Sequence, residues 1–253
     1  MNRPTDTLAD EPPSHDRILV AVCTYNEREN LPKLLVDIRR AVPQADILVV
    51  DDRSPDGTGD WAQQQRAEAP WLRVTIREGK LGLGSAIVHA MRYACREGYA
   101  YLVNLDGDRS HDPASIPALL HAMETQQADV AIGSRYVEGG AIEGWPWSRR
   151  VMSHALNRLA RFSLGLEAYD CSGAFRCYRI ESLRQVDLRQ VRCEGYAMLE
   201  EILWLLKGSD AKIVEIPITF VNRTEGASKL SFSEAVNALA TLARLAIARQ
   251  RST

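Results

Sequence analysis

The sequence lacks a long apolar run, a cysteine framework and an excess of charge of one sign. No segment reaches the roughly 18 consecutive apolar residues that cross a bilayer, so we expect a chain that does not span a membrane by itself. The five cysteines show no C-x-x-C spacing, which argues against a structural zinc site and a disulfide framework and favours a reducing cytosol. The formal net charge of -2 argues against a globally basic nucleic-acid-binding protein.

The composition is that of an ordinary globular protein. Of the 253 residues, 45% are hydrophobic and 25% are charged, enough for one large core. Residues 1–16 hold three prolines and several acidic residues but no apolar h-region, which predicts a disordered tail rather than a signal peptide. We expect one domain at residues 17–230 and an amphipathic helix at residues 231–253 that packs on this domain or lies at a membrane interface.

Apolar runs alternate with helical patterns along the chain. Strands are predicted at residues 18–23, 47–50, 72–76, 101–105, 130–132, 173–178 and 212–220. Helices are predicted at residues 30–42, 58–68, 84–96, 116–125, 148–164 and 196–207. This rhythm predicts an α/β fold, a Rossmann-like and mostly parallel sheet with helices on both faces.

The run Asp106-Gly107-Asp108 stands at the end of the fourth predicted strand. Two carboxylates one residue apart at the carboxyl edge of a sheet are hard oxygen ligands for Mg²⁺ or Mn²⁺, which bridge to phosphate groups. By itself, an Asp-Gly-Asp run fits a solvated turn as well as a metal site. Two other acidic strand ends nearby favour the metal site.

Those strand ends follow the first and second predicted strands. Tyr25 offers a stacking face, and Glu27 and Asp52 offer acceptors for a base or ribose. The alternative is a turn or helix-cap role, which is as plausible for Asp51 and less so for Asp52. Residues 79–84 match a dinucleotide-binding motif poorly, and we expect Lys80 and this glycine-rich run to close over a nucleotide.

Together these segments resemble the family-2 glycosyltransferases of the GT-A fold and, within them, the dolichyl- or polyprenyl-phosphate mannosyltransferases, also called dolichol-phosphate mannose synthases. The resemblance extends from Arg17 to Leu230. It rests on the motifs above and on Ser110-His111, Gly133-Ser134-Arg135-Tyr136, Trp145 with Arg149 and Ser153, residues 170–179, Gly195-Tyr196, and residues 215–223 leading to Gly226-Ala227-Ser228-Lys229.

The resemblance implies a role for each matching residue. Nucleotide-sugar binding would fall to Cys23, Tyr25, Glu27, Val50, Asp52, Lys80, Asp106, Gly107, Asp108, Arg135, Arg223 and Lys229. Asp106, Asp108 and Ser110 would hold the metal, Arg149 and Ser153 would bind the acceptor phosphate, and Asp106, Asp108, Arg223 and Lys229 would be the catalytic set. The chain departs from the family pattern at Cys23, usually proline, at Gly107, usually alanine, and at Arg109, usually apolar, so we expect a looser and more basic loop there.

The implied reaction is inverting transfer of mannose from GDP-mannose to dolichyl or polyprenyl phosphate, assisted by Mg²⁺ or Mn²⁺. A lipid acceptor implies a cytoplasmic protein peripherally associated with the membrane surface, through the last helix, through Trp145 and Trp147, or through a small membrane-anchored partner. No nucleic-acid partner is expected.

Three alternatives stay open at this point. One is a GT-A transferase that uses UDP-glucose or another acceptor. Another is a non-catalytic nucleotide-sugar-binding module, which could lack the metal pair and the acceptor cations that are present here. The third, a nicotinamide-dependent dehydrogenase, fits least well, because the glycine-rich run follows the third strand rather than the first.

Overall fold

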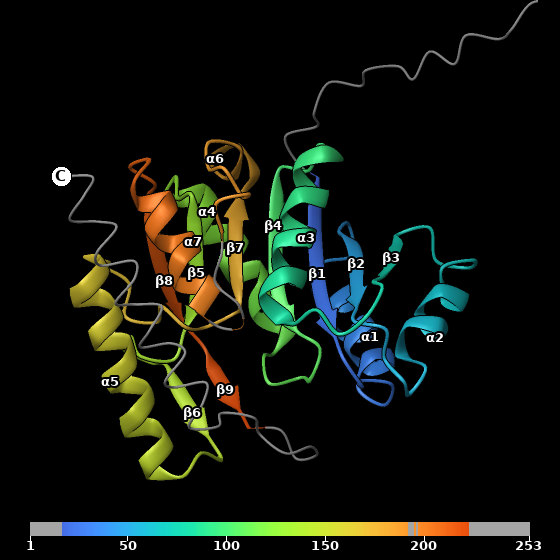
Figure 1. Cartoon of the computed structure of the whole chain (residues 1–253), viewed down its shortest axis with the longest axis horizontal. Coiled ribbons are helices and arrows are strands. Elements are labelled where there is room, and N and C mark those ends of the chain that lie inside the picture. The colour runs from blue at the N-terminus through green and yellow to red at the C-terminus, as the bar shows by residue number, and fades with distance from the viewer. Residues whose placement is uncertain (1–16, 192–194, 196, 223–253) are drawn as a thin grey trace, which may run out of the picture.

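The computed structural model describes residues 17–191, 195 and 197–222 (Figure 1). The amino-terminal half contains β1 (Ile18–Thr24), α1 (Leu31–Ala41), β2 (Asp46–Asp51), α2 (Thr58–Gln65), β3 (Leu72–Ile76), α3 (Leu83–Arg96) and β4 (Tyr101–Asp106). The second half contains η1 (Pro113–Ser115), α4 (Ile116–Thr125), β5 (Val130–Ser134), β6 (Ala141–Glu143), α5 (Trp147–Leu164), β7 (Arg176–Arg179), α6 (Ile180–Arg184), α7 (Ala197–Lys207), β8 (Ile213–Pro217) and β9 (Thr219–Val221).

Seven strands form one sheet in the order β3-β2-β1-β4-β7-β5-β8. Only β7 runs antiparallel to its neighbours β4 and β5, so the predicted α/β fold with a mostly parallel sheet is confirmed. A second, two-stranded sheet pairs β6 with β9. Figure 1 shows α5 at the edge of the molecule farthest from β3.

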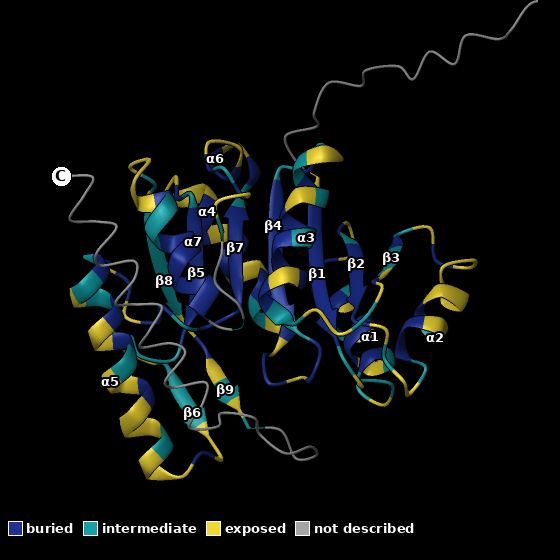
Figure 2. Ribbon diagram, viewed as in Figure 1, coloured by how far each residue is buried: buried dark blue, intermediate teal, exposed yellow. Residues whose placement is uncertain are grey.

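The core lies on both faces of the sheet, as expected for strands that are apolar without alternation. In β1, Leu19 and Ala21 pack toward the face covered by α3 and α7, whereas Val20 and Val22 pack toward α1 and α4. Strands β1 and β5 are buried throughout, and β4 and β7 are buried except at their last residues, Asp106 and Arg179 (Figure 2). Each fully buried aliphatic side chain contributes about 1.5–3 kcal/mol, so this double-sided core holds the strand ends rigidly in place.

The helices follow from their apolar periodicity. In α1 the buried residues Leu31, Leu34, Leu35 and Ile38 share one face, and basic residues occupy the last turn. None of the described helices is long and apolar enough to cross a membrane.

Several element predictions were wrong in detail. The single strand expected at residues 212–220 is two strands, because Ile218 bonds back to Ser134 between them and the chain passes from the large sheet to the small one. The strand expected from residue 173 begins at Arg176, since Gly173 donates to Asp170 in a turn instead. Neither β6 nor α6 was expected, because three and five residues are too few to show a period.

Candidate active site

The three acidic strand ends, which follow β1, β2 and β4, lie side by side, as the sequence predicted. β1 is the central strand of the three, and Cys23 is in register with Val50 of β2 on one side and with Asp106 of β4 on the other. Because the three strands are parallel, their carboxyl ends open to the same edge of the sheet, where α/β proteins bind ligands.

The loop after β4 is fixed against β1. Asp106 is half-buried and Asp108 is buried, with an Asp108 carboxylate oxygen accepting a hydrogen bond from the Ser110 backbone at 2.9 Å. A Cβ at Gly107 would lie only 3.0 Å from Thr24 Cγ2 and 3.1 Å from the Cys23 carbonyl oxygen. The missing side chain of Gly107 therefore permits close packing of this loop against β1.

An ion pair partly neutralises the charge that Arg109 adds to this loop. Arg109 has a positive φ of 61° and an exposed side chain, and its guanidinium forms an ion pair with Asp37 of α1 at 3.1 Å. This contact directs the charge of Arg109 toward α1.

The donor set after β4 suits a hard divalent cation. Asp106 and Asp108 supply carboxylates, and Ser110 supplies a buried hydroxyl oxygen that has no hydrogen-bond partner among the described residues. Oxygen ligands of this kind favour Mg²⁺ and Mn²⁺ over softer metals. The described residues contain no group of three or more His, Cys, Asp and Glu side chains that could hold a metal.

His111 follows this donor set but is packed as a core residue. Its ring lies 5.3 Å from the rings of both Phe175 and Phe220. Burial, only partly opposed by the Asp108 carboxylate, lowers the pKa of His111 to about 4, so the imidazole is neutral at physiological pH.

Asp52 is tied to the glycine-rich run at residues 79–84. Its carboxylate accepts hydrogen bonds from the Arg77 guanidinium and, at 2.8 Å, from the Gly82 backbone. Arg77 in turn donates to Ser85 Oγ at 2.6 Å and to the Gly82 carbonyl at 3.0 Å. Sequence reasoning missed Arg77; the only signal was a basic residue between the third strand and the glycine-rich run.

Asp51 has the turn role that was left open for it. Its carboxylate accepts bonds from the Thr24 hydroxyl at 2.9 Å and from the Ser54 backbone at 2.8 Å. These bonds join the ends of β1 and β2, and they do not involve the neighbouring Asp52, whose carboxylate binds Arg77 and Gly82 instead.

The predicted nucleotide-binding residues after β1 and β3 come together. The Lys80 ammonium lies 4.0 Å from the centre of the Tyr25 ring, although the two belong to different loops. Glu27 is half-buried and accepts a bond from Asn30 at 2.8 Å. Val50 and Cys23 are buried in their strands, and burial raises the pKa of the Cys23 thiol, which therefore stays protonated and is no nucleophile.

Arg135 forms a buried ion pair that the sequence did not predict. Its guanidinium donates to both oxygens of Asp170, at 2.7 and 2.6 Å, and to Ser172 Oγ at 3.0 Å. Burial raises the pKa of Asp170, but the Arg135 charge and its hydrogen bonds outweigh it and hold that pKa below its usual value. The pair is thus charged at neutral pH.

Arg149 and Ser153 lie one turn apart on α5. The Arg149 guanidinium stacks on the Trp145 ring at 3.9 Å, and its Nη1 is 3.5 Å from Asn222 Oδ1. Ser153 is buried, and its hydroxyl lies 2.6 Å from that of Tyr136, the residue after Arg135. The other two predicted cations, Arg223 and Lys229, lie outside the described residues, as do the predicted tail at 1–16 and helix at 231–253.

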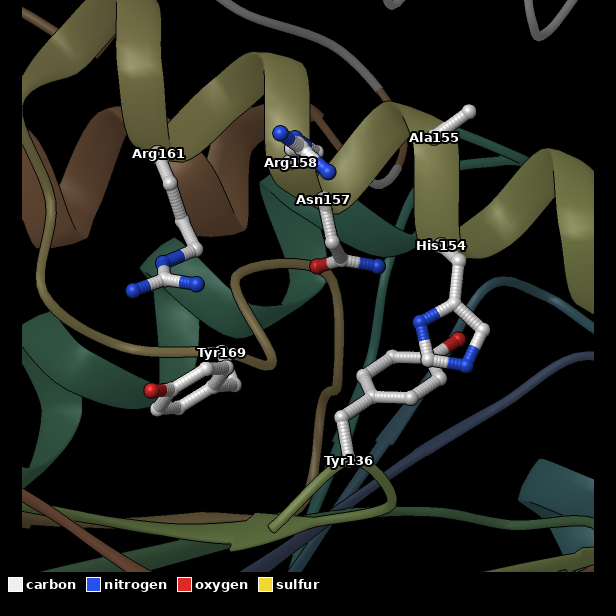
Figure 3. A pocket seen from close by; sticks show the side chains of 7 residues that line it. All are labelled: Tyr136, His154, Ala155, Asn157, Arg158, Arg161 and Tyr169. Atoms are coloured by element: carbon white, nitrogen blue, oxygen red, sulfur yellow. The ribbon is translucent and has the colours of Figure 1, made fainter.

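A pocket of about 620 Å³ lies beside α5 (Figure 3). Tyr136, His154, Ala155, Asn157, Arg158, Arg161 and Tyr169 line it. The Arg161 guanidinium lies 3.9 Å from the Tyr169 ring centre, and the His154 and Tyr136 rings are 4.3 Å apart. Sequence reasoning did not find this pocket, because its two walls are joined only in the fold.

Comparison with known proteins places the chain in one family. The family model for glycosyl transferase family 2 matches residues 19–187. The chain is 45% identical over 215 residues to an undecaprenyl-phosphate mannosyltransferase of Micrococcus luteus, covering 85% of this chain and 88% of the relative. It is 42% identical over 232 residues to the polyprenol monophosphomannose synthase of Mycolicibacterium smegmatis, covering 91% and 87%.

Solved structures support the fold. Glucosyl-3-phosphoglycerate synthase of Mycobacterium tuberculosis, crystallised with Mn²⁺ and UDP, aligns with a TM-score of 0.63 at 21% identity over 91% of this chain and 80% of its own. The mannosyltransferase PcManGT of Pyrobaculum calidifontis, crystallised with GDP-Man and Mn²⁺, aligns with a TM-score of 0.58 at 15% identity, covering 96% and 67%. With the sheet order, the acidic strand ends and the family match in agreement, the chain belongs to glycosyl transferase family 2 and is a glycosyltransferase of the GT-A fold.

Proposed function

We propose that this glycosyltransferase moves mannose from GDP-mannose to a dolichyl or polyprenyl phosphate, giving prenyl phosphate mannose and GDP. The observation that carries the proposal is the similarity, at 42–45% identity over most of the chain, to two proteins named for mannosyl transfer to such lipids. The arrangement of charges around the carboxyl edge of the sheet supports it.

The donor nucleotide would lie at the ends of β1 and β2. Tyr25 provides an aromatic face, and the Asp52 carboxylate, oriented by Arg77, provides acceptors for the N–H groups of guanine. Lys80, in contact with Tyr25, would bring a positive charge toward the diphosphate.

The diphosphate would lie at the end of β4. Asp106, Asp108 and Ser110 would hold Mg²⁺ or Mn²⁺, and the bound ion supplies positive charge that stabilises the departing diphosphate.

The acceptor phosphate would lie against α5. Arg149 offers a guanidinium, and the Ser153 hydroxyl is held in place by Tyr136. A phosphate monoester is already anionic near neutral pH, so the site needs no strong general base and acts mainly by positioning. A phosphate oxygen attacks the anomeric carbon, the bond to the GDP oxygen breaks with its electron pair, and this single displacement inverts the configuration.

A donor panel tests the proposal. Purified protein is incubated with polyprenyl phosphate, with Mg²⁺ or Mn²⁺, and with GDP-mannose or UDP-glucose, and the lipid product is identified by mass spectrometry. Mannosyl transfer from GDP-mannose is expected, and Asp108→Asn is the matched inactive control. Transfer from UDP-glucose with none from GDP-mannose would overturn the proposed donor.

A further inference from the structure

The turn at residues 169–173 is held by side chains from two other parts of the fold. Each of its backbone N–H groups donates to a side-chain oxygen. Glu215 of β8 accepts from residues 169 and 170, at 2.7 and 2.9 Å, and Asn157 of α5 accepts from residues 171 and 172, at 2.8 and 3.2 Å. Asp170 accepts from residue 173 at 2.9 Å. Because the turn lies outside the helices and strands, these side chains take the place of a regular backbone partner and define its shape.

The turn carries the two side chains that fix the Arg135 guanidinium. Asp170 accepts from Nε at 2.7 Å and from Nη2 at 2.6 Å, and Ser172 Oγ accepts from Nη2 at 3.0 Å. A carboxylate that binds a planar guanidinium through two bonds imposes one orientation on it. Since both acceptors belong to one short turn, a displacement of the turn would change the direction of the Arg135 charge.

Arg135 lies near the end of β4, where the metal donor set is found. Its guanidinium carbon is 5.6 Å from the centre of the Phe220 ring, and that ring lies 5.3 Å from the ring of His111. Burial lowers the pKa of Arg135, but the Asp170 carboxylate outweighs burial and, with a smaller contribution from Asp106, raises this pKa above its usual value. The charges of Arg135 and Asp106 therefore act on each other across the crevice.

Asn157 also ties the turn to the part of α5 that carries Ser153. Its side chain is buried on one side of the helix (Figure 3). The amide Nδ2 donates to the Ser153 carbonyl at 2.9 Å and to Ser172 Oγ at 3.2 Å, and this Oγ is the atom that accepts from Arg135. One amide group thus connects the backbone of α5 with the anchor of the Arg135 guanidinium.

We propose that Asn157 and Glu215 are positioning residues for sugar transfer. They direct the Arg135 guanidinium toward the donor diphosphate and fix its place relative to Ser153, acting through the turn rather than on the reacting atoms. The proposal rests on the proposed function, with Arg135 as a cation beside the nucleotide sugar. A fixed cation stabilises charge that develops on the leaving group, so a displacement of about 1 Å should lower kcat more than it weakens substrate binding.

Steady-state kinetics of the full-length protein test the positioning role. The substrates are those that the donor panel identifies, which are GDP-mannose and polyprenyl phosphate in the proposed function. Asn157→Ala and Glu215→Ala each remove the acceptor of two backbone N–H groups. Each should lower kcat about thirtyfold, with both KM values within about threefold of wild type. Glu215→Gln keeps one acceptor oxygen and should lose less activity than Glu215→Ala.

A matched control separates this role from a loss of stability. Ser182 of α6 is also buried, and its hydroxyl donates to Asp129, which precedes β5 at the amino edge of the sheet, away from the metal donor set. Ser182→Ala therefore removes a buried side-chain hydrogen bond far from the site and should keep wild-type kcat. Circular dichroism at the assay temperature verifies that each variant is folded.

A second comparison removes the group on which both residues act. Arg135→Met combined with Asp170→Leu eliminates the guanidinium that the turn directs, together with its counter-charge. In this background Asn157→Ala should change kcat by less than about threefold, because no Arg135 charge is left to displace. A purely structural role of Asn157 would instead give the same loss in both backgrounds.

The outcomes separate this proposal from the proposed function. Transfer from another donor overturns the proposed function, and the same variants are then compared on that donor. The positioning role is overturned if either Asn157→Ala or Glu215→Ala keeps wild-type kcat, or if Ser182→Ala loses as much activity. It is also overturned if the loss caused by Asn157→Ala persists when Arg135 and Asp170 are replaced.

Discussion

Replacing Asp170 by asparagine is expected to leave the Arg135 guanidinium charged and buried without its counter-charge. The side chains of Asp170 and Arg135 are only 0% and 8% exposed. The carboxylate accepts four hydrogen bonds: from Arg135 Nε, Nη2 and backbone, and from the Gly173 backbone. Asparagine keeps one carbonyl acceptor and turns an amide N–H group toward a cation.

The expected loss of stability follows from this burial. Removing one partner of a buried ion pair costs about 3–5 kcal/mol, because the remaining charge is uncompensated. For a chain of this size that loss lowers the melting temperature by roughly 6–20 °C. Urea denaturation of wild type and Asp170→Asn near neutral pH measures the difference directly.

The pH dependence of this loss has a defined sign. Burial raises the pKa of Asp170, but the pairing with Arg135 outweighs burial and holds this pKa below its usual value. The ionised carboxylate therefore stabilises the folded state fully at pH values above the pKa that Asp170 has in the unfolded chain. The difference between wild type and variant should therefore be constant near neutral pH. It should shrink in acid, as pH falls through the lowered pKa.

Two further variants make the experiment decisive. Asp187→Asn removes a carboxylate from the solvent-exposed Arg189 pair and should leave the unfolding midpoint unchanged. Arg135→Met combined with Asp170→Leu removes both buried charges and should recover much of the lost stability. If Asp170→Asn is no less stable than Asp187→Asn, the reasoning about the buried pair is refuted.

Other substitutions probe the donor side and the core. Asp108→Asn should lower metal-dependent transfer at least about a hundredfold without moving the unfolding midpoint; retained activity would exclude Asp108 as a ligand. Arg77→Gln should raise KM for the nucleotide sugar about tenfold in steady-state kinetics, because Asp52 loses its orienting partner. An unchanged KM would show that Asp52 does not bind the nucleotide sugar. Burial raises the pKa of Glu200 to about 8, so wild-type stability should fall as pH rises from 4.5 to 8, and Glu200→Gln should remove that fall in urea titrations at several pH values.

The strands and the donor edge were predictable because their signals are local. A strand buried on both faces is a continuous apolar run, and in a parallel sheet its carboxyl end lies at a known edge. Asp52, Asp106 and Asp108 could thus be assigned to one crevice from their positions after strands two and four. The same signal could not distinguish Asp51, whose bonds to Thr24 and Ser54 appear only in the fold.

The part of the site near α5 was predicted less completely, because its contacts join residues far apart in the chain. Arg135 pairs with Asp170, 35 residues away, and nothing in the local pattern of either residue indicates the other. Apolar residues on an expected helix are read as core-facing, whereas on α5 they face outward and Ser153 and Asn157 face inward.

The opposite charges of the two sides fit the proposed reaction, in which two anions must meet. At an effective dielectric constant near 20, two unit charges about 4 Å apart repel by about 4 kcal/mol, which would slow the attack severely. Carboxylates at the end of β4 suit a divalent cation, which in the proposed reaction would lie beside the leaving diphosphate. Arg149 on α5 would supply a cation beside the incoming phosphate. Each anion would then be neutralised by its own positive charge. What the fold must still provide is a separation between β4 and α5 that lets the phosphate oxygen reach the anomeric carbon.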